Sequence, residues 1–339
     1  MHIGVVIPAY DAAHWIADAV ASVRSQTHRD WRLVVVDDGS TDGTGAVVAA
    51  FDDPRIRLIR QDNAGVSAAR NRGFAELCGI APVPRPTELG VGPIFPLLSR
   101  DEAAGKEHAV LFLDADDRLA PDALARLAAA LDAHQPAVAA SGACAFVDTG
   151  TIRWPPSGDI LRRLLVRNLF ANGGHVLIRA GAARRAGGFL PALRYGEDWE
   201  YLIRIALQGP FAAAPGRSPV LHVRQHASGA FRRAACDPAS FSPCMAAIFG
   251  NPTLVARFGA ARLASLIRRT EAENAWTVGR ELVRGGRLGE GRAWLARSVL
   301  AHPTAKRLAL LLAVAALPLL PARLWGPWLP YPQETVPPG

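Results

Sequence analysis

The chain is poor in lysine and cysteine, and it lacks the short patterns in which these residues usually carry chemistry. Its two lysines, Lys106 and Lys306, stand outside any GxxxxGK[ST] run, which excludes a P-loop nucleotide hydrolase. The four cysteines are scattered without a CxxC pair. We therefore expect neither a disulfide scaffold nor a structural zinc site.

The 339 residues are 50% hydrophobic and 20% charged, a composition that folds around a core and suits one large domain with an appendage. The formal net charge of +8 comes almost entirely from arginine, in short scattered pairs rather than one basic run interleaved with aromatics. We therefore expect no nucleic-acid partner. An anionic membrane surface or an anionic small substrate fits better, because either needs only a local basic patch.

The first half of the chain alternates between strand-like and helical patterns. Apolar runs without polar alternation, typical of strands buried on both faces of a parallel sheet, occupy residues 3–8, 33–37, 56–60 and 109–113. Helical patterns occupy residues 16–27, 65–77 and 121–131. This rhythm predicts an α/β domain with a mostly parallel sheet.

Two stretches interrupt the pattern. Residues 79–107 carry five prolines and are expected to form an inserted loop, and loops of this length are usually functional or mobile. After Ser228 further prolines mark a linker, and the rest of the chain is mostly helical. We expect an α/β domain over residues 1–232 and a helical region over residues 233–339. A strand-like run begins at Ile3 without a signal-peptide pattern, so we expect a cytoplasmic protein.

The helical tail contains an apolar segment, residues 308–322, between Lys306 and Arg323. A helix of this length measures roughly 22 Å, short of the roughly 30 Å hydrocarbon core of a bilayer. Two interpretations remain open. The segment lies on the inner membrane face as an interfacial helix, or it packs on the main domain.

Acidic residues follow two of the apolar runs. The run ending at Val36 continues as Asp37-Asp38-Gly39-Ser40, and the run ending at Leu113 continues as Asp114-Ala115-Asp116-Asp117. In open α/β sheets ligands lie outside the carboxyl ends of the strands, so both clusters should face one crevice. Clustered carboxylates repel one another unless a cation lies between them, and the Asp114-x-Asp116 spacing suits a hard divalent ion.

Several motifs occur in the order found in one enzyme family. They are Val5-Val6-Ile7-Pro8-Ala9-Tyr10, Ser22-x-x-x-Gln26-Thr27, residues 35–44 around Asp37-Asp38-Gly39-Ser40, Gly65 to Gly73 with Ala69-Arg70-Asn71, Phe112 to Asp117, and Gly196-Glu197-Asp198-Trp199. In this the chain resembles the family 2 glycosyltransferases, over residues 3 to about 228. A receiver domain fits worse because it needs a suitably placed lysine, and a nucleotidyltransferase would open with a glycine-rich loop.

The resemblance implies a Rossmann-like GT-A fold. It also implies an inverting hexosyltransferase that takes a sugar from a nucleotide-diphosphate sugar, with UDP-sugars favoured, in polysaccharide or glycolipid synthesis of the cell envelope. The acceptor would be a glycan or a lipid-linked glycan. The alternative is a catalytically inactive relative that serves as a binding or scaffold protein.

The same resemblance implies roles for particular residues. Those expected to bind the nucleotide sugar are Pro8, Ala9, Tyr10, Asp38, Arg70, Asn71, Asp114 and Arg224. Asp38 would accept a ring N–H of the base, and Arg70 would offer its planar cation to phosphate oxygens.

The remaining roles concern the metal and the proton. Asp116 and His226 are the expected ligands of Mn²⁺ or Mg²⁺, which would neutralise the leaving diphosphate. Asp198 is the expected base that takes the proton of the acceptor hydroxyl. Asp117 is expected to cap the following helix.

Overall fold

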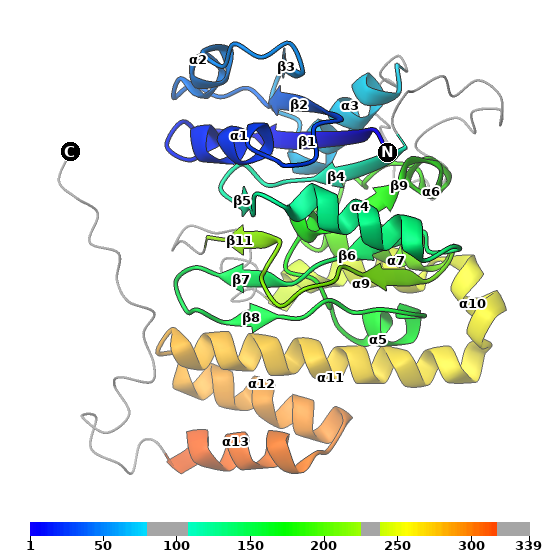
Figure 1. Ribbon diagram of the computed structural model, residues 1–339. Helices are drawn as coiled ribbons and strands as arrows, with labels where there is room; N and C mark the ends of the chain where they lie inside the picture. The colour runs from blue at the N-terminus through cyan, green and yellow to red at the C-terminus, as the bar shows by residue number, and fades with distance from the viewer. Residues whose placement is uncertain (80–107, 225–237, 317–339) are drawn as a thin grey trace. The chain divides into compact units, whose positions relative to one another are not determined.

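The computed structural model describes residues 1–79, 108–224 and 238–316 (Figure 1). The described chain forms two compact units. Unit 1 contains residues 1–161 and 168–224, and unit 2 contains residues 162–167 together with the C-terminal helices. The predicted boundary at residue 232, most of the predicted insertion at residues 79–107 and the end of the segment at residues 308–322 lie outside the described residues.

Unit 1 is built on a seven-stranded sheet with the order β10-β6-β9-β4-β1-β2-β3. The strands are β1 (Ile3–Ala9), β2 (Trp31–Asp37), β3 (Ile56–Arg60), β4 (Ala109–Phe112), β6 (Ala139–Ser141), β9 (Val176–Arg179) and β10 (Phe211–Ala213). All neighbours pair in parallel except at β9, which is antiparallel to both β4 and β6. The predicted strands at β1 to β4 and the mostly parallel sheet are confirmed.

Helices cover both faces of this sheet, which explains why its central strands are apolar on both sides. Ile3, Val5 and Ile7 of β1 lie in a core with α1 (Ile16–Arg24) and α4 (Ala123–Ala133). Val6 faces α3 (Val66–Cys78) on the opposite side. The helix predicted from Pro121 begins two residues later, because the segment before it closes a turn in which Ala123 N donates to Ala120 O (3.0 Å).

A second, four-stranded sheet with the order β5-β11-β7-β8 completes unit 1. Its strands are β5 (Arg118–Leu119), β7 (Cys144–Phe146), β8 (Ile152–Arg153) and β11 (Leu221–Val223). Unit 1 also contains α2 (Thr44–Ala49), the 3-10 turn η1 (Gly173–His175), α6 (Ala180–Ala186) and α7 (Glu197–Ala206). Because β5 directly follows the Asp114–Asp117 loop, this sheet brings the end of β11 to the acidic cluster.

Unit 2 is helical. Its elements are α5 (Leu161–Val166, which starts at the last residue of unit 1's first segment), η2 (Pro238–Phe241), α9 (Ser242–Phe249), α10 (Pro252–Phe258), α11 (Ala260–Arg284), α12 (Leu288–Ala301) and α13 (Ala305–Ala316). The α11–α12 pair packs backbone to backbone, since a Cβ on Gly279 would lie 3.0 Å from Gly291 O. Thr270 of α11 donates its hydroxyl to Leu165 O (2.8 Å), which ties α5 to this bundle.

The last described helix, α13, is apolar on two sides. Val314 is buried in a cluster with Trp276, Val283 and Leu295, whereas Leu308 and Leu312 are 48% and 61% exposed. In the described parts of the chain, no helix combines the length and the apolar character needed to cross a bilayer.

The contact of α3 with the sheet depends on Gly73, and it yields a test. A Cβ at this position would lie 2.4 Å from Val6 Cγ1 and 3.2 Å from Val36 Cγ2. We therefore expect Gly73→Ala to lower the free energy of unfolding by about 1–3 kcal/mol through overpacking, despite alanine's better helix propensity.

Denaturant unfolding of the chain measures this change in stability. Gly181→Ala in α6, where the nearest atom is the flexible end of Arg185 at 3.4 Å, is the control and should be neutral or stabilising. Equal effects of the two substitutions would contradict the argument.

Candidate active site

The site is built where β1, β2 and β4 end. Parallel pairing of β1 with both neighbours brings these ends to the same edge of the sheet. At the end of β1, Pro8 and Ala9 are buried, and Tyr10 is 54% exposed. Ala9 O accepts from Asp38 N (2.8 Å), which fixes the ends of β1 and β2 side by side. The ring of Tyr10 is therefore presented at this edge.

Asp38 is buried and holds the loop that leads into α3. Its Oδ1 accepts from Gln61 Nε2 (2.7 Å) and Ala64 N (2.9 Å), and its Oδ2 accepts from Gly65 N (2.8 Å). The loop lies so close that a Cβ on Gly39 (φ +83°) would be 2.9 Å from Asn63 N. An ionised carboxylate has about four acceptor positions, so Asp38 retains about one for a ligand N–H.

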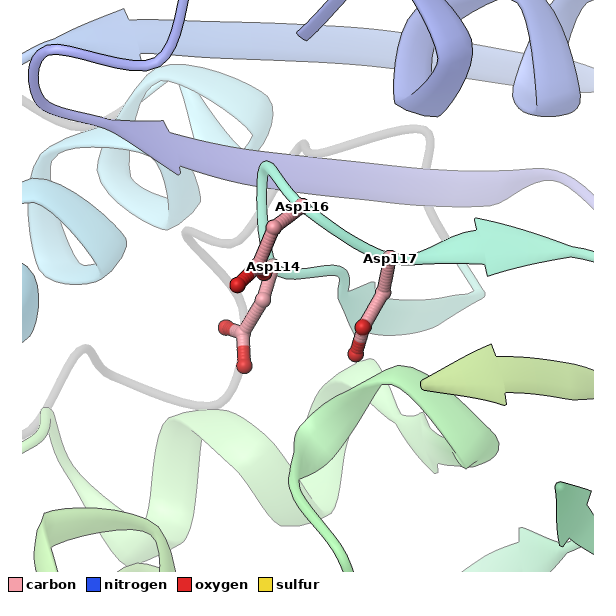
Figure 2. A group of neighbouring side chains, drawn as sticks. All are labelled: Asp114, Asp116 and Asp117. Atoms are coloured by element: carbon pink, nitrogen blue, oxygen red, sulfur yellow. The ribbon is translucent and has the colours of Figure 1, made fainter. Parts of the chain in front are cut away.

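The acidic loop after β4 gathers three carboxylates. One oxygen of each of Asp114, Asp116 and Asp117 lies within 4.8 Å of the others. Figure 2 shows Asp114 and Asp116 directed to the same side of the loop. Burial raises the pKa of Asp117 well above its usual range, and the charges of Asp116 and Asp114 add to this effect. Oxygen ligands that repel one another this closely fit a hard divalent cation.

Asp117 does not cap a helix, so that expectation is wrong. The N-cap of α4 is Asp122. Asp117 instead accepts from Arg224 N (3.0 Å) and from Asn172 Nδ2 (2.5 Å). The Asn172 amide is a partner of the acidic loop that sequence reasoning missed. It could not be found from a local pattern, because it lies 55 positions from Asp117 in sequence.

Arg70 and Asn71 of α3 have protein partners in the structure. Arg70 is buried and donates to Asp114 Oδ1 (2.7 Å) and Glu197 Oε1 (2.9 Å). Both carboxylates raise the pKa of its guanidinium against the effect of burial. The side-chain amide of Asn71 donates to Phe189 O (2.8 Å) and accepts from Phe189 N (2.7 Å). Their contact with a nucleotide stays a prediction.

Asp198 lies at the start of α7, next to Glu197. Its side chain is partly buried, and its Oδ1 accepts from Trp199 N (2.6 Å). Burial raises the pKa of Asp198 to about 7, with a further upward contribution from the charge of Glu197, against the opposing effect of Arg70. A carboxyl with a pKa near 7 can both accept and release a proton near neutral pH, as general acid–base catalysis requires.

Of the remaining predicted residues, Arg224 lies at the end of β11 and His226 lies outside the described residues. The guanidinium of Arg224 pairs with the carboxylate of Asp18 and lies over the ring of Trp15 (4.9 Å to its centroid), both near the start of α1. The structure thus brings Arg70, Asp114 and Asp198 together. It connects Arg224 to the acidic loop through the backbone contact with Asp117.

Known structures show which class of fold this is. TarS from S. aureus (residues 1–349, in complex with UDP) matches with a TM-score of 0.51 at 15% identity, over 89% of this chain and 81% of that chain. The mannosyltransferase PcManGT from Pyrobaculum calidifontis, in complex with GDP-Man and Mn²⁺, matches with a TM-score of 0.54 at 21% identity, over 96% and 82%. The chain therefore has the GT-A fold that its motifs predicted.

Sequence comparison relates the N-terminal part of the chain to one family of enzymes. Residues 4–79 match the model of glycosyl transferase family 2. The succinoglycan biosynthesis protein ExoO of Rhizobium meliloti is 27% identical over 65% of this chain and 60% of its own length. The E. coli UDP-Glc:alpha-D-GlcNAc-diphosphoundecaprenol beta-1,3-glucosyltransferase WfgD is 40% identical over 23% of this chain and 31% of its own length. Residues 4–79 thus resemble glycosyltransferase family 2, and the chain spans less than two thirds of the length of these curated relatives.

The raised pKa of Asp198 predicts a pH-dependent cost to folding. The pKa of Asp198 is about 7 in the folded chain, against 3.8 ordinarily, so the folded chain binds this proton more tightly than the unfolded chain does. Its stability penalty is therefore absent below pH 4, grows between pH 4 and 7, and is complete above pH 7. We expect Asp198→Asn to raise the free energy of unfolding at pH 8 by on the order of 2 kcal/mol, since one pKa unit corresponds to about 1.4 kcal/mol.

Denaturant unfolding of both proteins from pH 4 to 8 measures this difference, which should vanish at pH 4. Asp132→Asn, at an exposed position of α4, is the control and should show no pH-dependent difference from the unsubstituted protein. A constant difference across the pH range would contradict the raised pKa.

Proposed function

We propose that this chain is an inverting, metal-dependent hexosyltransferase that moves a sugar from a nucleotide-diphosphate sugar to an acceptor hydroxyl. The observation that carries the proposal is the meeting of two features at one sheet edge. The first is the acidic cluster of Asp114 and Asp116, and the second is Asp198, whose pKa lies near 7. A divalent cation suits the first, and deprotonation of a hydroxyl suits the second.

In the proposed reaction, Asp198 takes the proton of the acceptor hydroxyl. At the same time the oxygen of that hydroxyl bonds to the anomeric carbon of the donor sugar. The bond from that carbon to the nucleoside diphosphate breaks on the opposite face, which inverts the configuration. Asp116, with Asp114 beside it, would hold Mn²⁺ or Mg²⁺, whose charge would offset that of the leaving diphosphate. Arg224 would add positive charge near the acidic loop, and His226 would complete the ligand set.

We favour a UDP-sugar as donor. Asp38 has about one acceptor position left, and uracil offers a single ring N–H, whereas guanine presents two adjacent N–H donors. The ring of Tyr10, with Pro8 and Ala9 behind it, would lie against the base. Similar proteins include the UDP-Glc:alpha-D-GlcNAc-diphosphoundecaprenol beta-1,3-glucosyltransferase WfgD and the succinoglycan biosynthesis protein ExoO. We therefore propose a glycan or lipid-linked acceptor in synthesis of a cell-envelope polysaccharide or glycolipid.

Nucleotide binding tests the donor and the metal together. A ligand at one hundred times its Kd stabilises a protein by about 2.7 kcal/mol. For a domain of this size that raises the Tm by roughly 2–4 °C per kcal/mol. We expect UDP with Mn²⁺ to raise the Tm more than GDP with Mn²⁺, and more than UDP alone.

Asp116→Ala should abolish the Mn²⁺-dependent part of the shift, and Asp132→Ala, an exposed control on α4, should retain it. A larger shift with GDP would overturn the choice of UDP. No shift with any nucleotide would overturn the enzymatic proposal and leave the binding or scaffold function.

We further propose that the C-terminal helix places the protein on the cytoplasmic face of the cell membrane. Along α13 the exposed residues Leu308 and Leu312 lie one turn apart and share a face with the exposed Ala305, Ala309 and Ala313. Lys306 is also exposed at the start of the helix. An apolar stripe with a cationic end is typical of an interfacial helix on an anionic membrane.

Vesicle binding tests the stripe. We expect the full chain to sediment with vesicles of phosphatidylglycerol and phosphatidylcholine. The double substitution Leu308→Ser with Leu312→Ser should weaken this binding at least tenfold, because it removes two exposed leucines that would enter the membrane interface. Val255→Ser, at a 47% exposed position of α10, is the control. Unchanged sedimentation of the double variant would remove α13 from the proposal.

A further inference from the structure

Two consecutive side chains of α3 join it to a segment more than one hundred residues later. Asn71 pairs with the backbone of Phe189 through both its oxygen and its nitrogen (2.7 and 2.8 Å). Arg70 binds Glu197 at the first turn of α7 (2.9 Å). Both ends of the segment that leads into α7 are therefore attached to one turn of α3.

Arg70 also reaches the acidic loop. Its Nη2 donates to Asp114 Oδ1 (2.7 Å), while its Nη1 donates to Glu197. Only 3% of Arg70 is exposed, so its charge depends on these two carboxylates for compensation. Two nitrogens in a fixed planar fork can bind two separate carboxylates, which the point charge of a lysine does less well.

Aromatic rings pack beside these polar contacts. The Phe189 ring stacks on Tyr201 of α7 (4.1 Å between centroids) and meets Phe112, the last residue of β4, edge to face (4.9 Å). The guanidinium carbon of Arg70 lies 5.1 Å from the Phe189 centroid. The three elements that carry the proposed base, the proposed metal ligands and Arg70 thus share one aromatic cluster.

We propose that Arg70 and Asn71 are positioning residues that fix the first turn of α7, and with it Asp198, relative to the Asp114–Asp116 loop. They act on Asp198 through Glu197 and Phe189, and they bind protein groups rather than the nucleotide. This inference rests on the proposed function in taking Asp198 as the base. It replaces the sequence-based expectation that both side chains contact the base and phosphates.

Hydrogen exchange tests the positioning without any need for activity. In Arg70→Met and in Asn71→Ala, we expect the backbone amides of residues 189–200 to exchange at least tenfold faster, with exchange in β1 and β2 unchanged. Arg70→Lys, which can retain one of the two pairs, should show a smaller increase, and it serves if Arg70→Met fails to fold. Arg72→Met, on the same helix, is the matched control and should leave exchange unchanged.

Kinetics and binding then separate positioning from direct contact. Because a displacement of about 1 Å can cost roughly one hundredfold in rate, we expect Arg70→Met to lower kcat by about 100-fold, with the donor KM changed less than about threefold. Glu197→Gln added to Arg70→Met should cause no further loss in kcat, since both substitutions break the same link. Additive losses would show that Arg70 acts independently of Glu197.

Direct phosphate contact gives a different result. Arg70→Met would then weaken binding of UDP but not of uridine, and exchange in residues 189–200 would stay unchanged, which would overturn the inference. If the unsubstituted protein transfers no sugar from any donor, the proposed function fails. The exchange measurement still decides whether Arg70 and Asn71 hold the start of α7.

Discussion

Negative charge gathered at one edge of the sheet is the constraint on which the rest of unit 1 depends. The strand ends and the start of α7 place Asp38, Asp114, Asp117 and Asp198 along this edge, and burial raises the pKa of both Asp117 and Asp198. The carboxylates have different hydrogen-bond partners. Backbone N–H groups surround Asp38, the Asn172 amide and the Arg224 N–H hold Asp117, and the guanidinium of Arg70 pairs with Asp114. Asp198 accepts from Trp199 N, and its burial raises its pKa to about 7.

The sequence predicted those parts of the fold that are long enough to show a period. β1 to β4 are runs of four to seven residues, and β1, β2 and β4 are largely buried on both faces because helices cover both sides of the sheet, whereas the edge strand β3 is partly exposed. The second sheet could not be predicted in this way, since β5 and β8 have two residues each and β7 and β11 have three. Such strands are defined by partners far away in sequence. The antiparallel β9 has four residues, as many as β4, but it was also missed, and its place between β4 and β6 is set by partners far away in sequence.

For the candidate site as well, the sequence predicted one part and not another. Motif order pointed to Asp38, Asp114, Asp116 and Asp198, and the structure places the first two and the last among buried, interacting groups. What no single motif could show is which groups neutralise them. Arg70 stands 44 positions from Asp114, and Gly65, whose N–H binds Asp38, stands 27 positions from it. Asp117 was mistaken for a helix cap because local spacing fits that role, whereas tertiary partners decided otherwise.

The absence of a side chain at Gly73 also determines how far Arg70 extends into the site. Gly73 lets α3 rest directly on Val6 and Val36, and Arg70 stands one turn earlier on the same rigid helix. Any residue that lifted the helix from the sheet would carry the guanidinium away from Asp114 and stretch a hydrogen bond that now measures 2.7 Å. Hydrogen bonds weaken steeply beyond their normal length, so α3 cannot move far from the sheet without losing this contact. The smallest residue in the motif thus acts as a spacer that sets how far the longest side chain extends into the site.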